Sequence, residues 1–522
     1  MIIGKNILDN LTTGMYSDSK IIYREYIQNA CDQIDLAIKE KILNEEEGQI
    51  RIDIDSECRN ITIEDNATGV KADSFKPELG DIANSNKKIG ENKGFRGIGR
   101  LCGLAYCKKL VFSTTYKGEK TLSTMTCDAS KMREMLREDK KYTLEEIWNK
   151  IVTFSTSMDV ESDAHYFKVE LIGINQENEA LLNEQEVKEY LSFISPVAYS
   201  NRFIAFSDKI HEHAREIGYN IDEYQISVND ADIFKEYTTK LKEKDGSKDY
   251  DEITDLEFKD FYNQDNELIA WMWIGISKFE KVIPTINRMR SLRLRSGNIQ
   301  IGNDTVLDRF FYESRGNHYF IGEVFAVNKQ LIPNSQRDYF NENKCTKEFE
   351  RQIIDYFKEV LYRLYRSANV IKNNYEKLES FTKASKEFDK KDSRGGFIDE
   401  KDRRKSEREV KNAKKEAENA KEHIEKITKK IEPNSALAKV QKNIAKKYSS
   451  SSNYIRKSEK NKDSDLKKNS PYITNQMEKL SPREQKIVQR ILTIITDLVD
   501  EKDLAKRVIE KIKNEMNKFP DE

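Results

Sequence analysis

The sequence predicts an α/β domain, a second α/β domain and a helical C-terminal region that contains a coiled coil. Two observations carry this prediction: short β-branched runs alternate with helical runs up to about residue 350, and helical periodicity alone follows. The 522 residues leave room for three or four domains at roughly 150 residues each. We expect domains at 1–178 and 179–349, a basic helical region at 350–470 and a dimerisation element at 471–522.

The composition excludes several classes of protein. Charged residues make up 35% of the chain and aromatic residues 10%, which is polar but too aromatic for disorder throughout. No stretch approaches the roughly 18 apolar residues of a membrane span, and the N-terminus lacks a basic segment followed by a long apolar run. The six cysteines show neither a C-x-x-C pair nor zinc spacing. We therefore expect a protein of the reduced cytoplasm that does not enter membranes.

Short apolar runs supply the strands of both α/β domains. Ile50, Ile52 and Ile54 alternate with polar residues, which is the period of a half-buried strand. A polar turn separates this run from the next. The remaining runs of the first domain lie at 61–63, 110–112 and 167–171, and those of the second include 268–276 and 319–327.

A helix near the N-terminus carries three polar side chains on one face. Glu25, Asn29 and Asp32 lie at i, i+4 and i+7, so they fall within about 60° of one another. The apolar residues of the segment, such as Ile27 and Ile34, lie on the opposite side. Taken alone, this pattern predicts a solvated helix face.

Asp65 ends a strand and has the same parity as the apolar residues Ile61 and Ile63. Its carboxylate therefore points inward and needs a hydrogen-bond donor. The following turn, Asn-Ala-Thr-Gly at 66–69, lets a flat ligand approach the backbone. Taken alone, Asp65 is an ordinary aspartate at a strand end.

A glycine-rich segment at 90–99 leads directly into an apolar helix at 101–107. Glycines before a helix expose backbone N–H groups at its positive end, which is an arrangement that binds phosphate. A glycine cluster alone is weak evidence for a phosphate site. The chain has no G-x-x-x-x-G-K-[ST] sequence, so a P-loop NTPase is excluded.

These three elements, in this order within one hundred residues, resemble the nucleotide-binding motifs of the gyrase, heat-shock chaperone, histidine kinase and MutL (GHKL) ATPases. Within that superfamily the likeness is greatest to the 90-kilodalton heat-shock chaperones. MYSDSKIIYREYIQNACDQID at 15–35 resembles their first helix, and LGDIANS at 79–85 resembles the segment that opens their nucleotide lid. The resemblance covers residues 1 to about 110 and implies an α+β sandwich of the Bergerat type.

The resemblance implies a site for ATP and Mg²⁺. It makes Glu25 the general base that activates water, Asn29 the Mg²⁺ ligand and Asp65 the acceptor for the adenine amino group, roles that suit these side chains. It places Asp32 behind the residues that contact the nucleotide and the metal ion directly. The nucleotide-binding set that it implies is Asn29, Asp32, Asp65, Gly69, Asn84, Gly94, Gly97 and Gly99.

Two departures from the family pattern concern the adenine side of the site. Ala67 stands where the second motif usually has glycine, which adds a methyl group near the adenine edge. We expect nucleotide binding to survive this change in weakened form. The later strand of the family usually begins Gly-Thr, whereas this chain has Ala164-His165, so the second adenine-side hydroxyl has no predicted position.

The second domain carries a match of its own. LIPNSQRD at 331–338 resembles the catalytic loop of the chaperone middle domain, and this makes Arg337 the residue that reaches the γ-phosphate. A guanidinium suits that role because it is permanently charged and bidentate. Arg288, Arg290, Arg293 and Arg295 form a basic segment that either contacts nucleic acid or phosphate or, as the simpler interpretation that we expect, is a solvated strand face.

Apolar residues recur at helical spacing along the C-terminal region. The apolar spacing of 3 and 4 residues predicts a short coiled coil with close helix approach, although a single solvated helix also fits. A turn at 432–435 precedes a segment that is expected to pack back. Ser481, Pro482 and Glu484 predict a helix start, and the apolar stripes after it favour self-association. The coiled-coil residues are Val410, Ala413, Ala417, Ala420, Ile424, Ile427 and Ile431.

We therefore expect a homodimeric clamp that binds and hydrolyses Mg-ATP, with Glu25 and Arg337 as its catalytic residues, and that acts on a protein client or partner subunit. One alternative is a DNA-associated or antiviral-defence ATPase of bacteria that contacts nucleic acid through residues 371–470. That stretch holds 29 Lys and Arg against 18 Asp and Glu. A second alternative is a scaffold that is gated by nucleotide but does not hydrolyse it.

Overall fold

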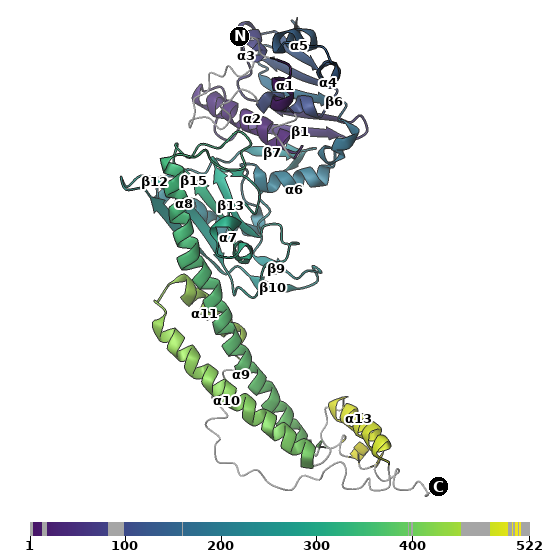
Figure 1. Ribbon diagram of the computed structural model, residues 1–522, viewed down its shortest axis with the longest axis vertical. Helices are drawn as coiled ribbons and strands as arrows, with labels where there is room; N and C mark the ends of the chain where they lie inside the picture. The colour runs from purple at the N-terminus through teal and green to yellow at the C-terminus, as the bar shows by residue number, and fades with distance from the viewer. Residues whose placement is uncertain are drawn as a thin grey trace. The chain divides into compact units, whose positions relative to one another are not determined.

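The computed structural model describes residues 4–12, 18–81, 99–158, 160–394, 396–397, 400–449, 481–498, 504, 507–509 and 511–512 (Figure 1). The chain divides into two compact units. The first unit comprises Met1–Ile276 and Lys281–Tyr362, and the second comprises Ser277–Glu280 and Arg363–Glu522. The first unit contains mixed α/β sheets and the second is helical, which confirms the predicted fold class.

The first sheet of the first unit has eight strands in the order β5-β4-β3-β6-β2-β1-β7-β8. Neighbouring strands are antiparallel except β1 and β7, which pair in parallel. The strands are β1 (Gln49–Asp55), β2 (Asn60–Asp65), β3 (Lys109–Thr115), β4 (Leu122–Asp128), β5 (Val152–Ser157), β6 (Tyr166–Ile172), β7 (Gln225–Val228) and β8 (Ala231–Asp232). The last two strands lie in the predicted second domain and extend this sheet.

Alternation along the strands places one face of this sheet against a core. Ile50, Ile52 and Ile61 are buried as predicted, and they share that core with apolar residues of the surrounding helices. The predicted apolar helix at 101–107 is the short 3-10 helix η1 (Gly99–Ala105). The helices of this part are α1 (Asn6–Thr12), α2 (Ile21–Lys39), α3 (Ala72–Gly80), α4 (Ala129–Arg137), α5 (Leu144–Ile151), η2 (Gln176–Leu181) and α6 (Glu184–Ile194).

The second sheet of the first unit has five strands in the order β11-β12-β15-β13-β14, and β13 and β15 pair in parallel. It shares a core, rich in aromatic residues, with helix α7 (Ile204–Glu216). The strands are β11 (Asp255–Tyr262), β12 (Leu268–Ile276), β13 (Ser291–Ser296), β14 (Ile299–Ile301) and β15 (Ile321–Ala326), and β9 (Lys240–Lys242) pairs with β10 (Asp249–Glu252). Further helical segments are η3 (Asn201–Phe203), η4 (Asp308–Phe310), η5 (Ser314–Tyr319), α8 (Lys344–Tyr356) and η6 (Phe357–Leu361).

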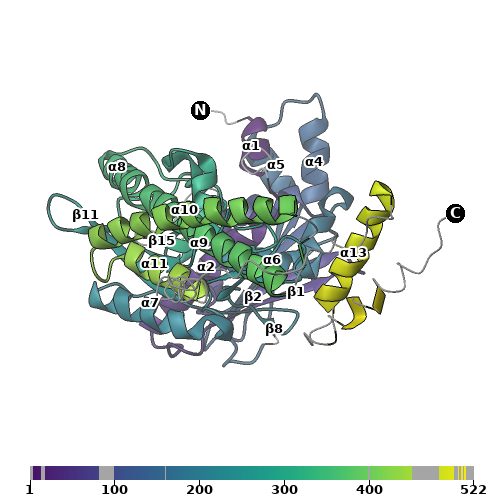
Figure 2. The same cartoon turned by 90° about the horizontal axis from the view of Figure 1, so that it is seen from below.

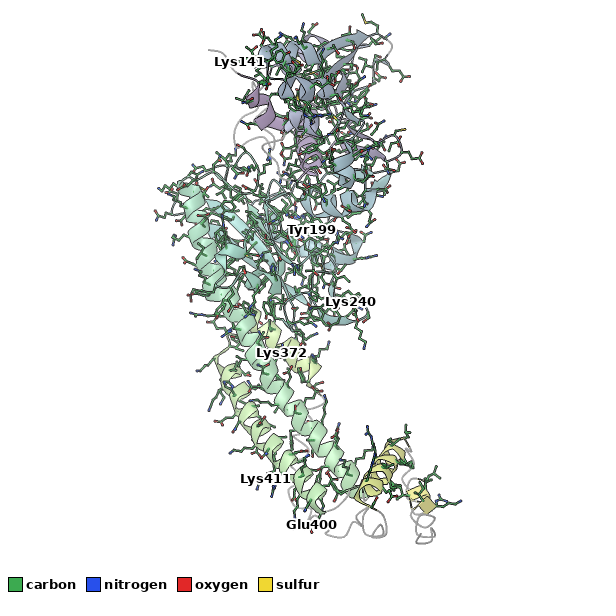
Figure 3. All side chains as sticks on the ribbon, turned by 45° about the vertical axis from the view of Figure 1, so that its right-hand side comes forward. Lys141, Tyr199, Lys240, Lys372, Glu400 and Lys411 are labelled. Atoms are coloured by element: carbon green, nitrogen blue, oxygen red, sulfur yellow. The ribbon has the colours of Figure 1, made fainter. Side chains whose placement is uncertain are left out.

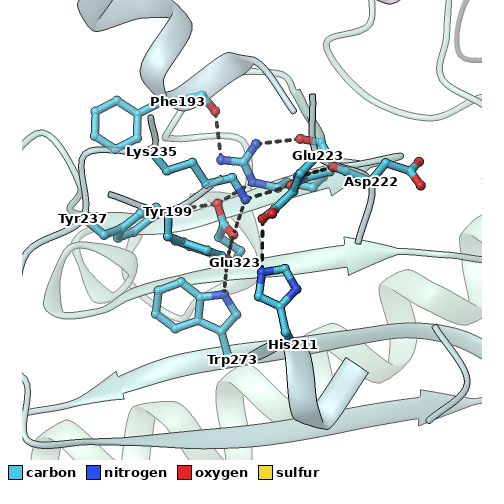
Figure 4. Close-up of polar contacts among 11 residues, drawn as sticks. Phe193, Tyr199, His211, Asp222, Glu223, Lys235, Tyr237, Trp273 and Glu323 are labelled. Atoms are coloured by element: carbon cyan, nitrogen blue, oxygen red, sulfur yellow. Dashed lines mark hydrogen bonds and ion pairs between the residues drawn. The ribbon is translucent and has the colours of Figure 1, made fainter. Parts of the chain in front are cut away.

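A buried polar network joins β13 to β15 (Figure 4). Arg295, Glu323 and Lys235 have fully buried side chains, and Glu323 forms ion pairs with the other two. Burial would raise the pKa of Glu323, but the charges of Arg295 and Lys235 lower it to about 2. The expected solvated strand face is therefore wrong for Arg295, and also for Arg293, because both side chains lie inside the domain.

The second unit is built from long helices (Figures 1 and 2). They are α9 (Tyr362–Arg394), α10 (Glu400–Lys430), α11 (Ala436–Lys447) and α13 (Pro482–Leu498). Lys372 on α9 and Glu400 and Lys411 on α10 are labelled in Figure 3.

Helix α10 lies beside α9 in both views, and side-chain contacts connect them. Asn374 Nδ2 lies 3.3 Å from His423 Nδ1, and Arg403 forms an ion pair with Asp392 at 3.1 Å. Ala417 and Ala420, from the predicted stripe, are buried, which argues against a single solvated helix. The coiled coil itself stays a prediction.

Helix α11 buries Val440 and Ile444, two of the residues expected to pack back after the turn. At the start of α13 the predicted cap is present: Ser481 N donates to Glu484 Oε2 at 2.9 Å. Leu492 of α13 packs with Val488 of the same helix and with Ile509 and Ile512.

Candidate functional site

Helix α2 positions the first set of predicted residues. Its apolar residues, such as Ile27 and Ile34, lie in the core. Glu25 and Asp32 on the other side of the helix are also buried, at 7% and 6% exposure, and Asn29 is half-buried. The interpretation of this face as solvated is therefore wrong, because other parts of the first unit cover it.

The Glu25 carboxylate lies between two other predicted residues. Its Oε1 is 3.1 Å from Nε of Arg337. A Cβ atom added at Gly99 would lie only 2.2 Å from its Oε2. Glycine at position 99 therefore leaves the space that the carboxylate occupies. Gly99 and Arg337, which lie about 70 and 310 positions along the chain from Glu25, thus meet at its carboxyl group.

The loop that carries Arg337 is held in an unusual conformation. Arg337 has a φ of +54°, which is uncommon for a residue with a side chain. Its N–H donates to Asn334 O at 3.2 Å, and its carbonyl accepts from Gly302 N at 2.9 Å. Arg24 on α2 donates from Nη2 to Gln336 O at 3.0 Å. Helix α2 thus contacts the loop through two neighbouring side chains, Arg24 and Glu25.

Asp65 closes strand β2 at the centre of the eight-stranded sheet. Its side chain is 5% exposed, and Oδ1 accepts from Ala67 N at 3.1 Å. The Ala67 carbonyl lies 2.7 Å from Nδ1 of His165. The two residues that depart from the family pattern, Ala67 and His165, therefore contact each other beside Asp65.

Gly69 is required by the backbone at its position. Its φ is +66°, and an added Cβ would lie 1.9 Å from the carbonyl oxygen of Thr115. The Thr114 hydroxyl accepts from Val70 N at 3.0 Å and donates to Tyr166 O at 2.7 Å. Sequence reasoning missed Thr114, since nothing in the pattern of β3 indicates that its hydroxyl holds the turn after Gly69.

Three predicted residues of the nucleotide-binding set, Asn84, Gly94 and Gly97, lie outside the described residues. Among the residues that the structure describes, the site brings together Glu25, Gly99 and Arg337, while Asp65 and Gly69 form a second group at the end of β2.

The residues present suit a nucleotide with its metal ion. The Gly99 backbone approaches the Glu25 carboxylate closely enough to exclude any Cβ. Backbone N–H groups that bind phosphate beside a general base need such a close approach. In the described part of the chain no cluster of three or more His, Cys, Asp or Glu residues could hold a metal ion. Mg²⁺ is usually bound by one or two protein groups together with substrate phosphates, so the amide oxygen of Asn29 is a sufficient type of ligand.

Residues 21–165 match the family model described as "Histidine kinase-, DNA gyrase B-, and HSP90-like ATPase". The chain is also similar to chaperone protein HtpG of Chromobacterium violaceum, at 30% identity over 161 residues, which are 27% of this chain and 24% of that protein. HtpG of Shewanella denitrificans is 36% identical over 132 residues, or 22% and 21% of the two chains. The chain thus matches about a quarter or less of the length of these curated relatives.

No helix within the described residues is both long enough and apolar enough to cross a membrane.

The family match covers the helix of Glu25, the strand of Asp65 and Gly99, and it ends at His165. The predicted resemblance is confirmed for this N-terminal part, which is similar to the GHKL ATPases and, among them, to the 90-kilodalton heat-shock chaperones.

Proposed function

We propose that the chain binds Mg-ATP, hydrolyses it to ADP and phosphate, and acts as a homodimeric clamp on a protein client or partner. The observation that carries this proposal is the meeting of Glu25 with both Gly99 and Arg337. A buried carboxylate, a glycine that leaves room at a helix start and an arginine from the loop between β15 and α8 are the groups that phosphoryl transfer to water needs.

Each residue has a distinct role in this proposal. Glu25 accepts the proton of the attacking water, and Arg337 stabilises the charge that develops on the terminal phosphate. Asn29 holds Mg²⁺, which neutralises phosphate charge when bound. Asp65 accepts a hydrogen bond from the adenine amino group, and Gly69 allows the tight backbone turn that follows Asp65.

The ion pair between Arg337 and Glu25 gives the site a resting arrangement. The pair compensates both charges, so neither side chain is buried without a partner. A terminal phosphate competes with Glu25 for the guanidinium and frees the carboxylate to accept a proton. Binding of the terminal phosphate by Arg337 and activation of Glu25 as the base are thereby the same step.

The test is ATP binding and phosphate release by the full chain and by Asp65→Asn. The amide at position 65 donates where the carboxylate accepts, so we expect binding to weaken at least about tenfold. Asp53→Asn, at an exposed position on β1, is the matched control and should bind as the wild type does. Equal binding by both variants contradicts the adenine assignment.

The excess of positive charge at 371–470 favours a second candidate function, a DNA-associated ATPase in bacterial defence. Binding of nucleic acid through this region should fall steeply with salt concentration, whereas client binding depends on apolar surface. Duplex DNA that stimulates phosphate release favours this candidate, and release that is indifferent to DNA favours the protein client. ATP binding without any turnover indicates the nucleotide-gated scaffold.

A further inference from the structure

The first unit contains a cavity of 1180 Å³ beside the candidate site. Its walls come from the start of α2, from α6, from the segment around β13 and β14 and from the loop of Arg337. Asn29, Asp65, Gly69 and Gly99 do not line it. The cavity is therefore separate from the nucleotide-binding residues, although Arg337 borders both.

Six basic side chains line this cavity together with five carboxylates. Three of them have carboxylate partners: Lys20 lies 3.8 Å from Glu186, Arg288 pairs with Glu189, and Arg337 pairs with Glu25. The other three have no ion pair within the described part of the chain. The complete set is Lys20, Arg24, Arg288, Arg290, Arg293 and Arg337.

Two of these three guanidinium groups are buried. Arg24 and Arg293 are 5% and 6% exposed, and the Nε atom of each has no hydrogen-bond partner among the described residues. Their other contacts are neutral: Arg24 donates to Gln336 O, and Arg293 donates to Gln300 Oε1 at 2.9 Å and to Arg288 O. The remaining carboxylates of the cavity wall, Asp18, Asp304 and Asp338, form no ion pair with either arginine.

A buried cation without an ion-pair partner is costly, and an anion in the cavity lowers that cost. Burial lowers the pKa of Arg293, and the more distant Tyr237, Asp304 and Glu323 offset this only in part. The Arg293 guanidinium also lies 4.2 Å from the centre of the Phe193 ring, which fixes its plane at the wall. Arginine in a fixed plane is the side chain best suited to bidentate contact with phosphate.

We propose that this cavity binds a small phosphate-bearing anion through Arg24, Arg290 and Arg293. Its volume slightly exceeds the usual range of small-molecule sites, roughly 300–1,000 Å³, so it admits ligands up to the size of a nucleotide. The rings of Tyr190 and Phe193 line the same space and offer apolar contact to the rest of such a ligand. The proposal does not depend on ATP hydrolysis.

Calorimetric titration of the full chain tests the proposal, with inorganic phosphate, pyrophosphate and AMP as separate probes. Arg293→Gln and Arg290→Gln should each weaken binding of at least one probe by about tenfold or more, since each removes a charge-assisted contact. Arg315→Gln changes an exposed arginine away from the cavity and should leave binding unchanged.

The probes distinguish the sources of the anion. Binding of inorganic phosphate that the arginine variants weaken indicates that free phosphate suffices, whereas binding of AMP alone that they weaken indicates a phosphorylated organic molecule. Loss of probe binding in Asp65→Asn, with no effect of the arginine variants, overturns the proposal, and so does the absence of binding by any probe at millimolar concentration. If Arg293→Gln fails to fold, the half-buried Arg290 decides the test by itself.

Discussion

At the scale of single residues, the candidate site depends on close approaches that only particular side chains allow. Gly99 makes room for the Glu25 carboxylate, and Gly69 places its backbone against the carbonyl of Thr115. Arg337 adopts a left-handed conformation that brings its guanidinium to Glu25. The geometry of the site thus rests on backbone positions as much as on reactive groups.

Replacing Gly69 by alanine tests this dependence. The left-handed φ alone costs about 1 kcal/mol, and the collision of the new Cβ with backbone atoms should raise the total to at least about 2 kcal/mol. Gly218 also has a positive φ, of 73°, but no atom lies within 4 Å of its Cβ position, so Gly218→Ala is the matched control. We expect a clearly lower thermal midpoint for Gly69→Ala than for Gly218→Ala, and equal midpoints contradict the close approach.

Glu323 offers a second prediction at this scale. Glu323→Ala leaves Arg295 and Lys235 buried without their counter-charge, which should cost about 3–5 kcal/mol of stability. Glu313→Ala breaks a surface pair with Arg315 and should cost less than about 1 kcal/mol. Urea denaturation compares the two variants, and a similar loss in both shows that the buried network contributes little.

The same carboxylate predicts a dependence on pH. The folded pKa of Glu323, about 2, lies below its ordinary value of 4.5. Its contribution to stability is therefore complete above about pH 4.5 and is lost as the pH falls through about 2. Acid unfolding followed by circular dichroism should be less steep in Glu323→Gln than in wild type across this interval. Parallel acid transitions of the two proteins would refute the assignment.

At the scale of elements, local sequence patterns predicted the bounds of strands, but they did not predict which distant strands pair. Strand β12 spans the predicted residues 268–276, because its apolar run is continuous and bounded by polar turns. The parallel pairing of β1 with β7 could not be predicted, since it joins segments far apart in the sequence. Arg295 was expected at the surface because it belongs to a basic segment, and its partner Glu323 lies 28 residues away.

The candidate site shows the same division. Glu25, Asn29 and Asp32 share one helix, so their spacing was sufficient to predict that they lie together. The contact of Gly99 with Glu25 needed the resemblance to a family, and the hydroxyl of Thr114 had no signal at all in the sequence. Residues whose role is to hold a turn 44 positions away are visible only in the structure.

Helix packing in the second unit can be tested on α10. Ala417 is buried, so Ala417→Glu introduces a larger and charged side chain where α10 packs, and should destabilise the unit by more than about 2 kcal/mol. Asn419→Glu places the same side chain at an exposed position of the helix. Thermal loss of helical signal should begin earlier only in Ala417→Glu. Equal melting would show that α10 is a solvated helix.

At the scale of the whole molecule, the proposed clamp requires two copies of the chain. Helix α13 buries Leu492 but exposes Ile487, Ile491, Ile494 and Leu498, the last at 77%. These residues are spaced by 4, 3 and 4 positions and therefore form one apolar face. In the proposed clamp a second copy of the chain covers this face, which would explain why it is apolar.

Ile491→Gln should weaken self-association at least about tenfold, because it puts an amide in the middle of this face. Arg490→Gln, at the neighbouring exposed position, is the control and should leave the mass unchanged. Light scattering after size exclusion measures the mass over a range of concentrations. A wild-type protein that is monomeric throughout that range contradicts the clamp.

The most direct test of the central claim is phosphate release by Glu25→Ala beside the wild type and Glu40→Ala, with ATP binding measured on the same samples. Glu40 caps the same helix at an exposed position. We predict that Glu25→Ala binds ATP but loses about 10²–10⁴-fold in turnover, the usual contribution of a general base, while Glu40→Ala is unaffected. Turnover by Glu25→Ala at the wild-type rate would contradict the assignment of Glu25 as the base.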